Sequence, residues 1–240
     1  MHDSGAERPK RALICGVSGQ DGAYLARHLL ALGYEVVGTS RDMAGNPFTG
    51  LKTLGIRDKV RLIDMDTSVR ASVLKTVGEV APDEIYNLGG LSSVAYSFQQ
   101  PVEAIESIAV VTLYMLDAIR NSNPAIRFYN AGSSECFGEA ADRPADEHSP
   151  FRPSSPYSVA KTTAYWEVVN YREAYGLFAC TGILFNHESP LRPERFVTGK
   201  IVAAARRIAA GSKERLRLGN LDIERDWGWA PEYVAAMHLM

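Results

Sequence analysis

Short apolar runs are spaced along the chain, and between them apolar residues recur every three or four positions. The runs predict strands at residues 11–15, 35–40, 60–66, 84–88, 126–134 and 178–186. After the first run, Leu25, Leu29 and Leu32 lie on one face of a predicted helix.

Two longer helices are predicted at 102–120, which follows Pro101, and at 157–175, which Pro156 opens. Strands that alternate with helices form parallel βαβ units, because a crossover helix must connect neighbouring parallel strands. We therefore predict an α/β protein with a doubly wound parallel sheet.

Composition excludes several classes of protein. The 240 residues are 46% hydrophobic and 22% charged, which is typical of a globular chain. The net charge of -2 gives no field that favours nucleic acid or an anionic membrane, and we expect neither as a partner. Cys15, Cys136 and Cys180 lack metal-ligand spacing, so we expect no metal and a cytoplasmic protein in a reducing compartment.

A glycine cluster joins the first predicted strand to the helix that follows it. In "GVSGQDG" the glycines are Gly16, Gly19 and Gly22, with Gln20 and Asp21 before the last. Glycines here let the backbone turn tightly and approach a pyrophosphate, whose charge is favourable at a helix N-terminus. The cluster predicts a dinucleotide-binding site formed by these five residues.

The residues that end the second predicted strand select the dinucleotide, and here they are Ser40, Arg41 and Asp42. An acidic residue would bind a ribose 2′-hydroxyl, whereas Arg41 suits the 2′-phosphate of NADP. We predict NADP, with a solvated pair of Arg41 and Asp42 as the alternative. Asp66, ending the third strand, is predicted to accept a hydrogen bond from the adenine amino group; alternatively it caps the helix near Ser68.

The regular alternation ends near residue 186, where the polar stretch "NHESPLRPERFVT" begins. We expect a disordered tail at 1–9, an NADP-binding domain at 10–186 and a smaller C-terminal substrate-binding lobe at 187–240. The chain can return from this lobe to the first domain. Because the sequence stops inside a predicted helix, we expect the lobe to be incomplete.

Tyr157 and Lys161 are four residues apart in a predicted helix, so their side chains share one face. A free tyrosine has a pKa of about 10, too high for a base at neutral pH, and a neighbouring ammonium favours the phenolate. Ser133, at the end of the fifth predicted strand, can hydrogen-bond the reacting oxygen. The three residues predict a site in which Tyr157 is the base.

These features together resemble the extended short-chain dehydrogenase/reductase family, and most closely its GDP-mannose 4,6-dehydratases. The matching stretches are "GVSGQDGAYLA", "PDEIYNLGG", "FYNAGSSECFG", "RPSSPYSVAK", "NYREAYGLFACTGILFNHESPLR" and "LGNLDIERDWGWAPEYV". The resemblance implies a Rossmann-type sheet with a smaller substrate lobe, NADP as cofactor and a nucleotide-linked sugar as substrate.

By this resemblance, Glu135 is the catalytic glutamate of the site that Ser133, Tyr157 and Lys161 complete. Burying an unpaired carboxylate is unfavourable unless its pKa rises, so a chemical use must explain it. Dehydration supplies one, because a carboxyl can take the C5 proton and protonate the departing C6 hydroxyl. In an extended strand, Ser133 and Glu135 share a face, and Phe137 is an apolar neighbour that lifts the pKa. The alternative is a surface glutamate at a strand end.

The resemblance also implies binding residues beyond the catalytic group. They are Ser92, Asn186, Lys200 and Arg225 for the substrate, and Tyr157, Lys161, His187 and Arg192 for the cofactor. Arg192 is implied to reach the cofactor of a neighbouring subunit, which predicts a homo-oligomer, a dimer or tetramer. The chain departs from the family pattern at Leu91, Ile108, Val111 and Cys136. These changes touch the predicted active-site wall and a close helix contact.

We therefore predict NADP-dependent 4,6-dehydration of a nucleotide-linked hexose, most closely GDP-mannose to GDP-4-keto-6-deoxymannose. Tyr157 takes the proton of the 4-hydroxyl, and the hydride that leaves C4 returns to C6. Three alternatives remain open. They are a GDP-heptose 4,6-dehydratase, a nucleotide-sugar 4-keto reductase or epimerase that would not need Glu135, and a catalytically silent NADP-binding regulator.

Overall fold

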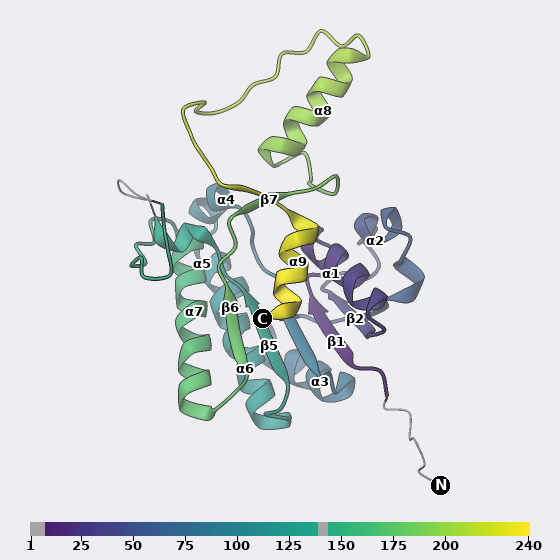
Figure 1. Ribbon diagram of the computed structural model, residues 1–240, viewed down its shortest axis with the longest axis vertical. Coiled ribbons are helices and arrows are strands. Elements are labelled where there is room, and N and C mark those ends of the chain that lie inside the picture. The colour runs from purple at the N-terminus through teal and green to yellow at the C-terminus, as the bar shows by residue number, and fades with distance from the viewer. Residues whose placement is uncertain (1–7, 139–143) are drawn as a thin grey trace.

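A six-stranded parallel sheet forms the centre of the computed structural model, which describes residues 8–138 and 144–240 (Figure 1). Its strands are β1 (Arg11–Cys15), β2 (Glu35–Ser40), β3 (Arg61–Asp64), β4 (Glu84–Asn87), β5 (Arg127–Ala131) and β6 (Ala179–Gly182). They lie in the order β3-β2-β1-β4-β5-β6, and each neighbouring pair is parallel. The predicted doubly wound Rossmann-type sheet is confirmed, and its strand order reverses between β1 and β4.

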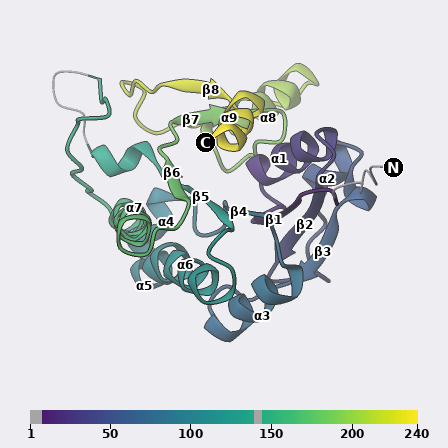
Figure 2. The ribbon, with the colours of Figure 1, turned by 60° about the horizontal axis from the view of Figure 1, so that its bottom comes forward.

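Helices cover both faces of this sheet (Figure 2). One face carries α1 (Gln20–Ala31) and α9 (Ala230–Leu239); the other carries α3 (Arg70–Val80), α6 (Val111–Ser122) and α7 (Pro156–Tyr175). Leu25 and Leu29 are fully buried in the first core as predicted, but Leu32, predicted on the same face, lies just after α1 and is exposed; Phe128 is buried in the second core. Burial on both faces explains why the strands are continuous apolar runs.

The predicted helix 102–120 consists of three consecutive segments. They are α5 (Pro101–Ile105), the π-helical η2 (Glu106–Val110) and the first turns of α6. The Thr112 hydroxyl donates to the Ile108 carbonyl at 2.7 Å, next to this wider turn.

The predicted strand 126–134 was too long, because β5 ends at Ala131. Ser133 instead caps a short 3-10 helix, η3 (Ser134–Phe137), and its hydroxyl accepts the Glu135 N–H at 3.3 Å. The prediction that Ser133 and Glu135 share one face of an extended strand is therefore wrong. A serine side chain that bonds the local backbone favours a turn over a strand.

Two other strands are also shorter than predicted. β3 ends at Asp64, so Asp66 lies in the loop beyond it. β6 ends at Gly182, so Asn186 does not end that strand. It begins β7 (Asn186–Glu188), which pairs in parallel with β8 (Trp227–Trp229) in a separate two-stranded sheet.

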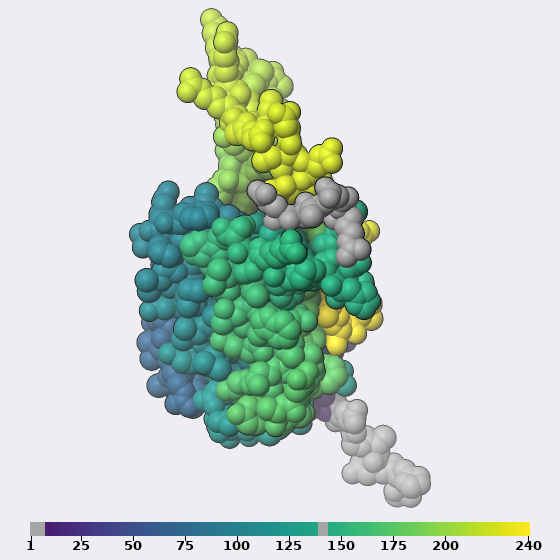
Figure 3. Space-filling model, turned by 90° about the vertical axis from the view of Figure 1, so that its left-hand side faces the viewer, coloured from purple at the N-terminus to yellow at the C-terminus, as the bar shows by residue number. Residues whose placement is uncertain are grey.

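Between β7 and β8 the chain forms a projecting segment, residues 197–226, which we call the arm. It contains α8 (Val197–Ala209), and within that helix Ala204 is the one buried residue. The arm stands out beyond the body of the molecule (Figures 1 and 3). After β8 the chain returns to the sheet as α9, where Ala230, Val234 and Met237 are buried beside α1.

The remaining described elements are short. They are α2 (Thr49–Thr53), η1 (Arg57–Lys59) and α4 (Val94–Gln99). At the start of the chain, Arg8 pairs with Asp83 at 2.7 Å. Residues 1–7 of the predicted tail lie outside the described residues.

Candidate active site

The glycine cluster forms a turn with no room for side chains. Gly16 has a φ of +84°, and a Cβ there would lie 2.9 Å from the Leu88 backbone. A Cβ on Gly22 would lie 2.4 Å from the Gly16 carbonyl oxygen. Gly19 caps α1 without a side-chain hydrogen bond, so the first N–H groups of the helix stay available to a ligand. A tight turn and an uncapped helix N-terminus fit a pyrophosphate.

The side chains of Gln20 and Asp21 contact the chain near β7. The Gln20 amide donates to the His187 carbonyl at 3.2 Å and accepts from the Ser189 hydroxyl at 2.8 Å. Asp21 lies 2.9 Å from His187 Nε2. The "GQDG" and "NHESP" motifs thus contact each other through these side chains. The backbone N–H groups of the turn therefore remain available to bind a ligand.

His187 is buried and held on three sides. Its Nδ1 lies 2.7 Å from the Phe185 carbonyl, and its ring stacks on Tyr233 with centroids 4.3 Å apart. Burial works against the charged ring, but hydrogen bonding and attraction from Asp21, with the Phe185 carbonyl, outweigh it and raise the pKa of His187. Because both ring nitrogens face acceptors, the doubly protonated imidazolium satisfies both.

The predicted catalytic side chains lie together at the carboxyl end of β5. Lys161 Nζ donates to the Ala131 carbonyl at 2.7 Å and lies 5.9 Å from the centroid of the Tyr157 ring. Burial lowers the pKa of Lys161 to about 8. Burial also raises the pKa of Tyr157 to about 12, and a hydrogen bond with Ser133 opposes that rise. In the protein alone, burial therefore outweighs the predicted stabilisation of the Tyr157 phenolate.

The charges of Glu135 and Arg192 also act on Tyr157. Burial is the largest cause of its raised pKa; among the smaller causes, the charge of Glu135 raises the pKa further and that of Arg192 opposes the rise. Phe137 follows Glu135 in η3 and packs 5.3 Å from Phe151, centroid to centroid. A carboxylate, a serine and a tyrosine thus meet at one place although the predicted strand geometry was wrong.

An apolar wall lies beside Tyr157. Ile108 is buried with Ala160 and Ala164, and Leu91 packs against this group, as does the Tyr157 ring. Two of the departures from the family pattern, at positions 91 and 108, therefore form part of one wall. Their apolar side chains add to the burial of the tyrosine.

Ser97, which sequence reasoning missed, positions the start of the catalytic helix. Its hydroxyl accepts the Tyr157 N–H at 3.1 Å and donates to the Val94 carbonyl at 2.7 Å. Ser155 and Ser158 form a capping box at the same helix end. The Ser-x-x-Ser spacing after Pro153 resembles a capping signal, but nothing local in the sequence indicates Ser97, which comes from α4.

Arg41 lies on the surface after β2, and no hydrogen bond or ion pair engages it within the described residues. Asp42 is also exposed, and its carboxylate accepts the Gly45 N–H at 2.7 Å. Asp66 accepts from the Ser68 N–H at 2.9 Å and from its hydroxyl, and these bonds lower the pKa of Asp66. These bonds form a turn before α3, whose N-cap residue is Val69 and has no side-chain cap hydrogen bond, so the alternative prediction that Asp66 caps this helix is wrong.

The predicted substrate residues are not gathered in this structure. Ser92 is exposed before α4, and Asn186 is partly buried opposite Trp227 in the small sheet. Lys200 and Arg225 are exposed in the arm, and the Lys200 ammonium bonds the Arg217 carbonyl.

Arg192 turns back on its own chain. Its Nε lies 3.1 Å from a Glu188 carboxylate oxygen, and its guanidinium lies 3.7 Å from the centroid of Phe196. These contacts hold it near the Tyr157 site of the same subunit.

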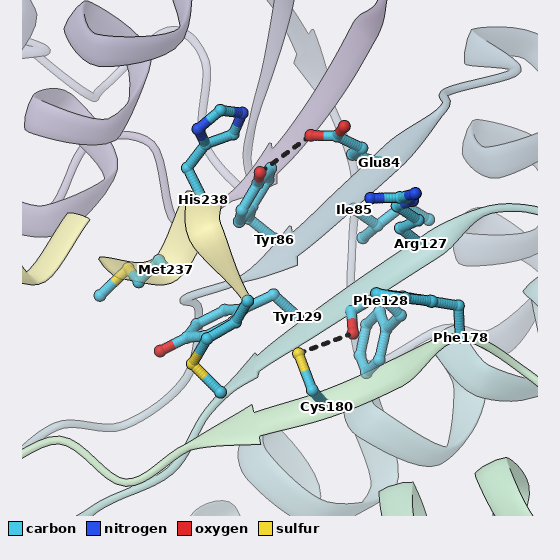
Figure 4. Close-up of a pocket in the computed structure, with 11 residues that line it drawn as sticks. Glu84, Ile85, Tyr86, Arg127, Phe128, Tyr129, Phe178, Cys180, Met237 and His238 are labelled. Carbon is cyan, nitrogen blue, oxygen red and sulfur yellow. Dashed lines mark hydrogen bonds between the residues drawn. The ribbon is translucent and has the colours of Figure 1, made fainter. Parts of the chain in front are cut away.

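A separate small cavity lies on the sheet face beneath α9 (Figure 4). Its volume of about 30 Å³ has room for one or two water molecules, so it does not fit a nucleotide sugar. Glu84 accepts the Tyr86 hydroxyl beside it at 2.9 Å. Within the described ranges, no three His, Cys, Asp or Glu side chains are grouped to hold a metal. No helix in the described part of the chain is long and apolar enough to cross a bilayer.

Comparison with known proteins gives consistent matches. The model of the family described as GDP-mannose 4,6 dehydratase matches residues 13–240. GDP-mannose 4,6 dehydratase 1 of Arabidopsis thaliana is 44% identical over 99% of this chain and 69% of its own length. The GDP-mannose 4,6-dehydratase of Sinorhizobium fredii strain HH103 is 48% identical over 96% of this chain and 68% of its own. That of Vibrio cholerae is 45% identical, and the chain covers 64% of its length.

Solved structures share the fold at lower identity. A dTDP-glucose 4,6-dehydratase from Streptomyces venezuelae, with NAD bound, superimposes with a TM-score of 0.82 at 21% identity and covers 95% of this chain and 71% of its own. A UDP-glucose 4-epimerase from Thermotoga maritima gives 0.83 at 19%, over 95% of this chain and 72% of its own. The present chain thus spans about two thirds of the length of its curated relatives.

Proposed function

The chain belongs to the GDP-mannose 4,6-dehydratase family, and from that premise we propose that it catalyses the NADP-dependent 4,6-dehydration of a GDP-linked hexose, most closely GDP-mannose. The observation that carries the proposal is the meeting of Glu135 with Ser133, Tyr157 and Lys161. A simple reductase needs the last three residues alone, and a carboxyl beside them has a use in removing water.

The chain's own residues divide the proton transfers of this reaction. Ser133 and Tyr157 hydrogen-bond the oxygen at C4, and Tyr157 takes its proton. Lys161 lies on the same helix face and supplies positive charge that favours the phenolate. Glu135 takes the C5 proton, which a 4-keto group makes acidic, and gives a proton to the departing C6 hydroxyl. The chemistry that a bound nicotinamide supplies is hydride acceptance from C4 and hydride return at C6.

The choice of NADP rests on Arg41. Its guanidinium is exposed after β2, at the sheet edge where a dinucleotide places its adenosine ribose in this fold. Asp42 is engaged by Gly45, so the neighbouring carboxylate does not occupy the arginine. An exposed guanidinium suits a 2′-phosphate, because charge-assisted and bidentate bonds form there.

Incubation with GDP-mannose, followed by mass spectrometry of the sugar nucleotide, tests the proposal. We expect a product lighter by one water, formed without an added reductant because the hydride returns to the substrate. Tyr157→Phe should stop the reaction and keep the fold. An unchanged mass would oppose a GDP-mannose dehydratase; loss of water from a GDP-heptose alone would redirect the proposal to that sugar.

We also propose a homo-oligomer. Large apolar side chains are exposed along one side of the molecule, on helices α4 to α7, and exposed apolar patches mark interaction surfaces. They include Phe98, Val102, Val159 and Trp166, which are 62%, 67%, 43% and 57% exposed. Light scattering of the protein with cofactor at micromolar concentration should give a dimer or tetramer, and a monomer would contradict the proposal.

A further inference from the structure

An acidic residue lies at the helix N-terminus where the proposed pyrophosphate would bind. Asp21 is in the first turn of α1, between the last two glycines of the cluster, Gly19 and Gly22. A carboxylate there is favourable for an isolated helix, because it faces the positive end of the helix dipole. It is unfavourable for a second anion at the same end, since the two negative charges repel each other.

We propose that His187 neutralises Asp21 and thereby makes the glycine turn competent to bind the dinucleotide pyrophosphate, acting as a positioning residue rather than as a ligand. This inference rests on the proposed dinucleotide-dependent function and assigns His187 a different role from the direct cofactor contact that family resemblance implies.

The contacts of His187 leave it no ring nitrogen for a ligand. Nε2 faces Asp21 at 2.9 Å and Nδ1 faces the Phe185 carbonyl at 2.7 Å. Tyr233 from α9 covers one face of the ring at 4.3 Å. The residue is 8% exposed, so its charge is screened little by water.

The charged groups around the ring favour a positive imidazolium. Asp21 from α1 is the acidic group that contacts it, and Arg192, in the loop after β7, is the positive group whose charge acts against it. Arg192 is itself paired with Glu188, which reduces that opposition. The pair of His187 and Asp21 therefore presents little net charge to the N-terminus of α1.

The same contacts join the turn to the rest of the site. Gln20 bonds both the His187 carbonyl and the Ser189 hydroxyl, at 3.2 and 2.8 Å. His187 is the middle residue of β7 and pairs with Gly228 of β8, where the chain returns from the arm. A change at His187 thus acts on the turn through Asp21 and reaches the arm through the small sheet.

The test is a double-mutant cycle read by NADPH binding, with the ligand's own fluorescence as the signal. His187→Gln should weaken binding about tenfold or more, because an uncompensated carboxylate then faces the pyrophosphate. Adding Asp21→Asn to this variant should restore most of the affinity. His187→Lys, which keeps a charge without the ring, should bind more tightly than His187→Gln. The control is His28→Gln, which removes an imidazole in α1 that does not contact Asp21. This variant should bind NADPH as the unmodified protein does.

A second readout needs no ligand. NMR of imidazole-labelled protein should show both nitrogens of His187 protonated at neutral pH, and circular dichroism should show that each variant is folded. If His187→Gln does not fold, His187→Lys, alone and combined with Asp21→Asn, replaces it in the cycle. In that case adding Asp21→Asn to His187→Lys should not weaken NADPH binding.

The outcomes separate this inference from the proposed function. Equal affinity of His187→Gln and the unmodified protein would overturn the inference alone. So would a double variant no better than His187→Gln, because the loss of a histidine that is itself a ligand cannot be rescued by removing Asp21. If the unmodified protein bound neither NADPH nor NADH, the proposed function would fail and the inference with it.

Discussion

The carboxyl edge of the large sheet and the arm carry the two halves of the proposed site, and they are built differently. At the sheet edge, Ser133 and Lys161 are buried and hydrogen-bonded. In the arm, Lys200 and Arg225 are exposed, and the helix that carries Lys200 buries one residue. The difference teaches that the proposed catalytic half is shaped by the packing of the sheet, whereas the charges proposed to bind the substrate are displayed on a segment with little packing of its own.

The first way to test this comparison has the largest expected effect. Glu135→Gln should reduce dehydration of GDP-mannose by about 10²–10⁴-fold, since the amide cannot move the C5 proton. Binding of NADP and GDP-sugar should remain, and single-turnover absorbance can show NADPH that accumulates. Glu173→Gln, an exposed change on α7, is the control. Near-normal turnover by Glu135→Gln would assign the proton transfer to another group.

The burial of Lys161 should be visible in the stability of the protein without ligand. Its pKa falls from 10.5 to about 8 on folding, because burial disfavours the ammonium. Between these values the unfolded chain binds a proton that the folded chain does not, so this group adds stability as pH rises through that window. The gain is on the order of 3 kcal/mol.

Urea unfolding at several pH values checks this effect. Lys161→Met should lack the rise between pH 8 and 10.5 that the unmodified protein gains from this group. Lys200→Met, an exposed change in the arm, should follow the unmodified protein. Parallel pH profiles for Lys161→Met and the unmodified protein would show that the lysine is not held in a buried site.

Arg41 tests whether an exposed charge can select the cofactor at the edge of the sheet. Arg41→Ala should weaken NADP binding about tenfold or more, the usual weight of a charge-assisted hydrogen bond, and change NAD binding little. Arg61→Ala is the matched control, because Arg61 is also exposed but begins β3, at the opposite edge of the sheet from Arg41. Equal binding of NADP and NAD by the unmodified protein would contradict the assignment.

The smallest expected effect is on the stability of the arm. Lys200→Ala and Arg225→Ala should each change the free energy of unfolding by within about 0.5 kcal/mol, because neither side chain is buried. If these charges bind the sugar nucleotide's diphosphate, its affinity should still fall measurably by calorimetry. A large loss of stability would mean that the arm packs more tightly than its exposed side chains indicate.

Periodicity alone predicted the architecture of the sheet. The apolar runs are strands because both faces of a parallel sheet are covered, and this leaves a signal in each strand's own residues. The glycine cluster was equally readable, since a turn without room for Cβ atoms needs glycine at fixed positions. Tyr157 and Lys161 share a helix face by their spacing, so their proximity was also a local property.

Contacts between distant segments were not readable in this way. Ser97 supports Tyr157 from another helix, and His187 meets Asp21 across most of the length of the chain. The strand end at Ala131 and the turn at Ser133 depend on a side chain that competes for the backbone, which apolar periodicity does not report. The sequence by itself therefore determined the elements, the glycine turn and the residue types of the catalytic group. Only the tertiary structure decided which side chains are buried, paired and charged, because those properties depend on neighbours that folding alone brings together.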